Sequence, residues 1–230
     1  MANKISNFAE YFQTYQESVN DPEGFWGKIA EEYQWHKKWD KVLDWSFTGP
    51  DAPDVNWFVN GKLNITENIF ERHLPERKDQ VALIWEPNDP KEEVVKYTYG
   101  ELYEKVCQFA NALKKLGIKK GDRVAIYLPM VPELPISMMA CARIGAIHSI
   151  VFAGFSASSL ADRINDSECN LVITSDGAYR GAKSIGLKGI VDEALKTCPS
   201  VKNTVILKRT GDEINFVEGR DIWWDDFLAG

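Results

Sequence analysis

Two loops in the middle of the sequence carry residues typical of an anion-binding site. The first, at residues 176–183, reads DGAYRGAK and contains two glycines, Arg180 and Lys183. Glycines let backbone N–H groups approach a phosphate, and arginine and lysine add charge-assisted hydrogen bonds. The spacing misses the P-loop pattern, because the two glycines are one residue too close and Ala182 separates Gly181 from the lysine. The pattern therefore predicts either a phosphate-binding loop or a solvated cationic surface loop.

The second loop, AGFS at residues 153–156, also follows an apolar run. A glycine beside a phenylalanine at a strand end is compatible with ligand entry and equally with tight packing. The three histidines are interpreted as structural, because none has a partner at a recognisable spacing. No Ser/His/Asp order, nucleophile elbow or zinc helix is present. The residues alone indicate no catalytic group and no metal site.

The elements that would position these loops alternate between strands and helices. Strands are predicted at Val124–Leu128, Ile147–Phe152 and Asn170–Ser175, with helices at Ile136–Gly145 and after the capping residue Ser156. This alternation favours a parallel sheet with right-handed crossovers. Ligands bind beyond the carboxyl ends of such strands, where both loops fall.

The flanking sequence completes an α/β pattern over residues 66–230. Thr98 and Glu101 form a capping box for a helix that ends at Gly117. Further elements are predicted as a helix at Asn64–Leu74, a hairpin of Val81–Glu86 with Glu93–Thr98, a helix at Ile190–Cys198, a strand at Thr204–Arg209 and a hairpin turn at TGDE (residues 210–213). We expect a largely parallel sheet with helices on both faces.

Residues 1–65 differ in composition from the rest of the chain and are predicted to form a helical, aromatic-rich extension. They hold five of the eight tryptophans. Trp26 and Tyr33 fall on one helical face, and Trp35 and Trp39 are one turn apart. Residues 48–64 are predicted to be an irregular connector. The aromatic residues indicate either a binding surface or a packing surface that grips the following domain.

Composition narrows the possible partners. The chain has 230 residues, a net charge of -7 and a pI near 5.1, which argues against a nucleic-acid partner. Residues 118–189 hold eight Lys/Arg against six Asp/Glu, which fits an anionic ligand or a chance fluctuation. The four cysteines are isolated, no secretory signal opens the chain, and no apolar run is long enough to span a bilayer. We expect a cytoplasmic, soluble protein without a membrane partner.

The central run resembles a known family. It reads GDRVAIYLPMVPELPISMMACARIGAIHSIVFAGFSASSLADRINDSECNLVITSDGAYRGAK and is similar to the AMP-forming acetyl-CoA synthetases of the acyl-adenylate-forming superfamily. KLNITENIFERHL, VALIWE, TYGELYEKVCQFANALKKLG and RDIWWDDF resemble blocks of that family in the same order. The aromatic N-terminal stretch resembles the extension of its acetyl-CoA synthetase branch.

The resemblance implies conversion of acetate, ATP and CoA to acetyl-CoA, AMP and pyrophosphate through an enzyme-bound acetyl-adenylate, with Mg2+. The positions that match the family's CoA site are Phe152, Ala153 and Gly154 along the CoA path, and Arg180, Gly181, Ala182 and Lys183 at its nucleotide end. In the family the arginine faces the 3′-phosphate and adenine region. Two departures stand out, because the family usually has glycine where this chain has Ala153 and Ala182.

Family members are much longer than this chain. Their phosphate loop, acyl pocket, Mg2+ carboxylate, hinge and C-terminal domain lie downstream of the matching region. We therefore expect an N-terminal fragment that is inactive alone and has the rest of the ligase chain as partner. The alternatives are a propionyl-CoA or other short-chain acyl-CoA synthetase, a stand-alone non-catalytic CoA-binding module, and a folding fragment without a ligand.

Overall fold

The computed structural model describes residues 5–181 and 183–229 and divides into two compact units. One runs up to Arg72 and the other starts at His73. Both predicted loops lie in the second unit. No helix in the described ranges is long and apolar enough to cross a membrane.

Two helices and a hairpin make up most of the first unit. The elements in order are α1 (Phe8–Asn20), α2 (Pro22–Ala30), β1 (Lys41–Ser46), β2 (Asp54–Val59) and α3 (Ile65–Ile69). β1 and β2 pair antiparallel. The Asp21 side chain accepts a hydrogen bond from Gly24 N–H at 3.0 Å and so begins α2.

The expected aromatic helix and irregular connector are wrong between residues 31 and 59. The helix ends at Ala30, and residues 41–59 form the hairpin instead. The Trp35 and Trp39 rings both pack on Phe58 of β2, with ring centroids 5.4 and 5.3 Å apart respectively. Aromatic residues suit strands as well as helices, so packing across the hairpin decides the structure here.

A five-stranded parallel sheet forms the centre of the second unit. Its strands are β5 (Arg123–Tyr127), β6 (Ile147–Ile150), β7 (Leu171–Ser175), β10 (Asn203–Leu207) and β11 (Asp221–Trp223). They lie in the order β11-β10-β7-β5-β6, and every neighbouring pair is parallel. The predicted α/β fold is confirmed.

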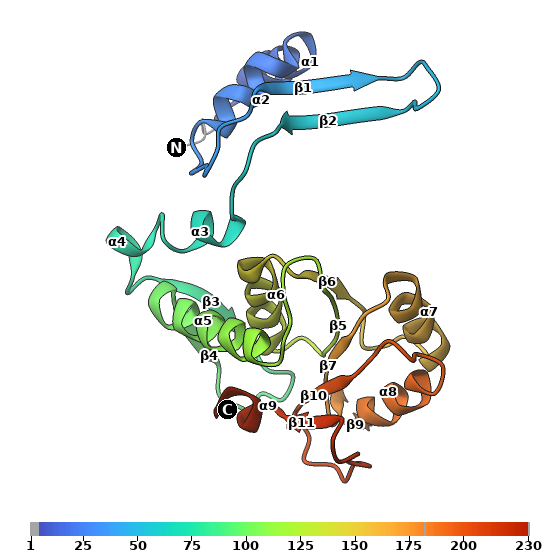
Figure 1. Cartoon of the computed structure of the whole chain (residues 1–230). Coiled ribbons are helices and arrows are strands. Elements are labelled where there is room, and N and C mark those ends of the chain that lie inside the picture. The colour runs from blue at the N-terminus through green and yellow to red at the C-terminus, as the bar shows by residue number, and fades with distance from the viewer. Residues whose placement is uncertain (1–4, 182, 230) are drawn as a thin grey trace. The chain divides into compact units, whose positions relative to one another are not determined.

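Helices cover both faces of this sheet (Figure 1). They are α5 (Tyr99–Lys115), α6 (Glu133–Ile144), α7 (Ala157–Ser167), α8 (Leu187–Leu195) and the short α9 (Trp224–Ala229). The chain steps outward from β5 to β6, then returns across β5 to β7. Right-handed crossovers in opposite directions place their helices on opposite faces, so α6 lies with α5 on one side and α7 with α8 on the other.

The strand registers match this layering. Val124 and Ile126 of β5 pair with Leu171 and Ile173 of β7, and their side chains share one face. The alternate residues, such as Ala125 and Val172, belong to the apolar cluster under α7 and α8. Both faces of the central strands are buried, which explains why these strands read as continuous apolar runs.

Smaller elements flank the sheet. They are α4 (Leu74–Arg77), the antiparallel pair β3 (Val81–Trp85) and β4 (Val95–Thr98), and the antiparallel pair β8 (Ala178–Arg180) and β9 (Lys183–Ile185). The capping box at Thr98 is present as predicted. The hairpin expected at TGDE is wrong, because residues 208–218 form a loop and the next strand, β11, runs parallel to β10.

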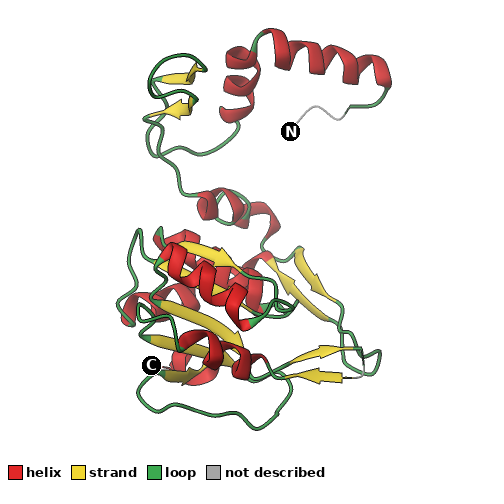
Figure 2. Cartoon of the chain, turned by 90° about the vertical axis from the view of Figure 1, so that its right-hand side faces the viewer, coloured by secondary structure: helices red, strands yellow, loops and turns green. Residues whose placement is uncertain are grey.

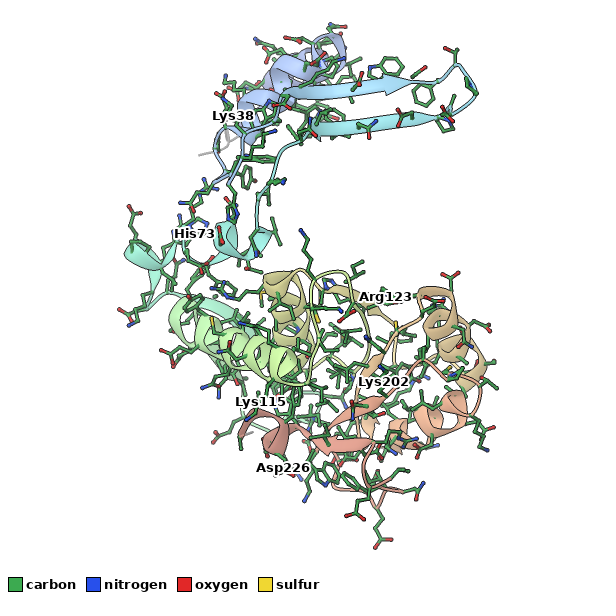
Figure 3. The ribbon with its side chains drawn as sticks, in the orientation of Figure 1. Lys38, His73, Lys115, Arg123, Lys202 and Asp226 are labelled. Atoms are coloured by element: carbon green, nitrogen blue, oxygen red, sulfur yellow. The ribbon has the colours of Figure 1, made fainter. Side chains whose placement is uncertain are left out.

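At the amino edge of the sheet, Arg123 links the start of β5 to the end of α7. Arg123, the first residue of β5, donates from Nε to the carbonyl of Ser167 at 2.6 Å and from Nη2 to that of Glu168 at 3.0 Å. These bonds satisfy carbonyls at the end of α7. Lys202 directly precedes β10 at the same edge (Figure 3).

A buried ion cluster joins α8 to β11. The Lys188 ammonium, with its side chain 1% exposed, lies 2.7 Å from Asp192 and 2.9 Å from Asp221. It also donates to the carbonyl of Asn215 at 2.8 Å. The Arg220 guanidinium contacts both carboxylates, at 2.6 and 2.7 Å. Two cations facing two anions make the burial of these charges tolerable.

Candidate functional site

A crevice opens at the carboxyl edge of the sheet between β5 and β7. The chain leaves β5 toward α6 on one face and leaves β7 toward α8 on the other, so neighbouring strands diverge there. Ligands of parallel α/β sheets bind at such a switch point. A cleft of about 580 Å3 lies at this edge. Its walls are residues 85–88, 129–131, 152–154 and 178–180, with Ile185 and Arg209.

The loop after β6 forms one wall and contains three of the predicted site residues, Phe152, Ala153 and Gly154. The hydroxyl of the buried Tyr127 donates to the carbonyl of Phe155 at 2.8 Å and to that of Ala153 at 3.3 Å, which fixes the loop. Burial raises the pKa of Tyr127. Phe152 is 68% exposed. A Cβ on Gly154 would lie 2.4 Å from the Phe152 ring, so the ring can hold this position only because residue 154 has no side chain.

The basic loop forms the opposite wall, and it is an antiparallel hairpin rather than a loop that runs directly into a helix. In the β8–β9 pairing Arg180 lies directly opposite Lys183. Gly181 takes a φ of 59°, the left-handed conformation that glycine adopts without strain. Ala182 lies outside the described residues. The helix that follows, α8, begins only at Leu187.

Arg180 and Lys183 form an exposed cation pair. Both side chains are exposed, and directly opposed strand residues point to the same face. Neither makes an ion pair with any residue that the structure describes. Like charges in this position repel each other, so an anion bound between them would be stabilised by both. Arg180 lines the cleft; Gly181 lines an adjoining hollow of about 810 Å3, and Lys183 lines neither.

Arg209 is a third cation at the cleft, and the sequence analysis missed it. It lines both hollows, and its guanidinium carbon lies 5.3 Å from the Trp85 ring centroid and 5.0 Å from that of Tyr179. Its Nη2 donates to Glu92 at 2.8 Å. The available signal was its place just after β10, because residues beyond the carboxyl ends of parallel strands line ligand sites.

The buried Asp176 carboxylate organises the loop that carries Arg209. Its Oδ1 accepts from the N–H groups of Arg209 and Thr210 at 2.7 and 3.0 Å, and its Oδ2 accepts from that of Gly211 at 2.7 Å. A Cβ on Gly177 would lie 2.6 Å from the Thr210 hydroxyl oxygen. It would also lie 3.0 Å from the carbonyl oxygen of Ile185, so a side chain at this position would not fit without a shift.

A separate hollow of about 340 Å3 lies near the start of α6. It contains Glu133, and burial raises the pKa of that carboxyl despite the opposing influence of its own N–H and of Arg209. In the part of the chain that the structure describes, no group of three or more His, Cys, Asp or Glu residues could hold a metal ion. The cleft at the carboxyl edge has two cationic side chains in its walls, Arg180 and Arg209.

Comparison with known proteins gives this geometry a context. Residues 70–226 match the model of the AMP-binding enzyme family, and residues 11–69 match that of the acetyl-coenzyme A synthetase N-terminus. The acetyl-coenzyme A synthetases of Desulfatibacillum aliphaticivorans and Syntrophobacter fumaroxidans are 51% and 53% identical over 96% and 95% of the chain. The chain spans only 34% and 33% of their lengths. The structure of acetoacetyl-CoA synthetase from Streptomyces lividans is similar over 98% of the chain and 33% of its own, with a TM-score of 0.84 and 25% identity.

Proposed function

The chain belongs to the AMP-binding enzyme family, and from this premise we propose that it is the N-terminal third of an AMP-forming acetate–CoA ligase. The ligase would convert acetate, ATP and CoA to acetyl-CoA, AMP and pyrophosphate through acetyl-adenylate. The similarity of the chain to acetyl-coenzyme A synthetases over nearly its whole length supports this assignment. Residues 1–65 would be the extension and residues 66–230 an incomplete AMP-binding domain. The cytoplasmic location expected from the isolated cysteines is part of the proposal.

The role proposed for this chain is to bind CoA during the second half-reaction. The observation that carries it is the exposed cation pair in which Arg180, a residue of the cleft wall, lies directly opposite Lys183. The nucleotide end of CoA bears a 3′-phosphate, and a charged guanidinium beside a phosphate forms strong, directional hydrogen bonds. Phe152, Ala153 and Gly154 would line the path of the coenzyme, and Gly181, Ala182 and Lys183 would complete the phosphate end.

The remaining chemistry is assigned to the rest of the ligase chain. ATP binding, acetate binding and Mg2+ coordination are proposed to use residues beyond this chain. The 230-residue chain should then bind CoA without forming acetyl-adenylate, because groups that stabilise the developing phosphoryl charge are supplied elsewhere. Acetate-dependent exchange of pyrophosphate into ATP is therefore expected to be absent from the purified chain.

Nuclear magnetic resonance of the 15N-labelled chain tests the assignment. Titration with CoA should shift amide signals of residues 152–156 and 178–185 in a saturable way, while signals of the amino edge, such as Arg123, stay unchanged. Absence of any saturable shift at millimolar CoA would contradict the cleft assignment. Pyrophosphate exchange by the chain alone would contradict its dependence on the remaining ligase.

The titration also separates the alternatives. A stand-alone CoA-binding module should bind with micromolar affinity, a half-site with millimolar affinity, and a folding fragment not at all. A propionyl-CoA or other short-chain synthetase would show the same CoA signals, because the acyl group is bound elsewhere. Relative rates with acetate and propionate, measured on the ligase that contains this sequence, distinguish that case.

A further inference from the structure

The β8–β9 hairpin has two chemically different faces. Residues alternate between the faces of a strand, and opposed residues share a face. Arg180 and Lys183 form the front face at the hairpin tip. Tyr179 pairs with Ser184, and these two residues form the back face.

The loop after β10 contacts this back face at two residues, Tyr179 and Ser184. The Arg209 guanidinium lies over the Tyr179 ring, 5.0 Å from its centroid. The Ser184 hydroxyl donates to Asp212 Oδ2. A third tie holds the tip, where Asn88 Nδ2 donates to the carbonyl of Gly181 at 3.0 Å. The tips of the β3–β4 and β8–β9 hairpins accordingly converge (Figure 2).

Arg209 contacts residues of β3, of β8 and of the loop between β3 and β4. Its guanidinium lies over the ring of Trp85 and over that of Tyr179, about 5 Å from each centroid, and also bonds to Glu92. Its side chain is only 17% exposed, so it is committed to these partners and is not a free surface cation. Its backbone N–H is held by Asp176 at 2.7 Å.

We infer that Arg209 is a positioning residue for the coenzyme site, holding the Tyr179–Ser184 face of the β8–β9 hairpin so that Arg180 and Lys183 stay together on its opposite face. This inference rests on the proposed function for its consequence in binding, but its structural part is independent of it. Opposed cations push a short hairpin apart, and a three-residue strand pair has little stability of its own. The contact of Arg209 with the Tyr179 ring stabilises the hairpin against this repulsion in the absence of a bound phosphate.

The geometry requires arginine at this position. A planar guanidinium stacks on two aromatic rings while donating to a carboxylate in its own plane. A lysine ammonium keeps the charge and can reach Glu92, but it has no flat surface for the rings. Arg209→Lys therefore separates geometry from charge, and Arg209→Ala removes both.

The experiment uses the 230-residue chain with Arg209→Ala, Arg209→Lys and the matched control Lys208→Ala. Lys208 is the neighbouring exposed cation and makes no hydrogen bond with the described residues of the hairpin. Hydrogen exchange of amides 178–185 reports the hairpin itself, without ligand. Dissociation constants for CoA and for 3′-dephospho-CoA report the front face.

In Arg209→Ala, exchange of the hairpin amides should rise about tenfold and the preference for CoA over 3′-dephospho-CoA should fall to about twofold or less. Arg209→Lys should show a smaller change in the same direction, and Lys208→Ala should match the wild type in both readouts. Unchanged exchange in Arg209→Ala would overturn the inference, even if CoA affinity fell, because Arg209 would then act on the ligand directly. If wild-type chain shows no preference for CoA, the proposed function fails while the exchange readout still decides the role of Arg209.

Discussion

Replacing Asp176 by asparagine should destabilise the second unit markedly, although the two side chains have the same shape. Asp176 is 1% exposed, and its two oxygens accept four backbone N–H groups. Asparagine retains one oxygen, while its NH2 group would face the N–H of Gly211, which now bonds to Oδ2 at 2.7 Å. The Gly211 N–H then loses its acceptor, and the remaining bonds lose their charge assistance.

The magnitude follows from these bonds. Loss of a hydrogen bond to a charged group costs about 1.5–3 kcal/mol, and the easier burial of a neutral amide offsets part of the change. We expect a net loss of about 2 kcal/mol, which corresponds to a melting midpoint lower by roughly 4–8 °C for a unit of this size.

Thermal unfolding of the chain, followed by calorimetry, measures this change. Asp166→Asn is the matched control, because Asp166 is exposed and makes no side-chain hydrogen bond among the described residues. Its free energy of unfolding should stay within about 0.5 kcal/mol of the wild-type value. Equal midpoints for the two variants would refute the role of Asp176 as the organiser of the loop after β10.

Three further changes test other features of the fold. Lys188→Met should cost about 3–5 kcal/mol in urea unfolding, because Asp221 loses a buried cationic partner; a loss below about 1 kcal/mol would contradict this. Burial raises the pKa of Glu133, so the folded state holds that proton to higher pH than the unfolded state, and stability falls as pH rises from about 4.3 through the folded pKa. Glu133→Gln removes that loss and should gain stability relative to the wild type between pH 4 and pH 7; a gain independent of pH would show that the carboxyl does not titrate as described. Burial also raises the pKa of Cys141 to about 12, so a thiol reagent at pH 8 should modify the half-buried Cys107 first and reach Cys141 only on unfolding; modification of Cys141 in the native chain would count against its burial.

The parallel sheet was predictable because its signals are local. Central strands buried on both faces must be continuous apolar runs, and Val124–Leu128 and Asn170–Ser175 have that form. The helices are marked by their caps, such as Thr98 with Glu101 and Ser156 before α7. Parallel strands then place both loops at one edge of the sheet, as expected.

The β8–β9 hairpin could not be predicted in the same way. Its strands have three residues each, too few to show a period of two. Their stability depends on contacts of Tyr179 with Arg209 and of Ser184 with Asp212, which lie 30 and 28 residues later in the chain. The contribution of Arg209 depends likewise on Trp85, which is distant in sequence. Tertiary contacts of this kind leave no trace in local spacing.

The candidate site was predictable in part. The structure brings Phe152, Ala153, Gly154 and Arg180 to one cleft, with Gly181 in the adjoining hollow. Their role in binding CoA stays a prediction, drawn from the family resemblance and from the exposed charge.

The β1–β2 hairpin was not foreseen, because tryptophans and charges in that segment fit a helix and a strand equally well.

The most direct measurement is the ratio of the dissociation constants of the chain for 3′-dephospho-CoA and CoA, in the wild type and in Arg180→Ala. If the cation pair binds the 3′-phosphate, the wild type should prefer CoA by about tenfold, or about 1.4 kcal/mol. The preference should fall to about twofold in Arg180→Ala, with the affinity for 3′-dephospho-CoA nearly unchanged. Equal affinities in the wild type, or a preference that survives in Arg180→Ala, would contradict the assignment of this edge of the sheet to the coenzyme.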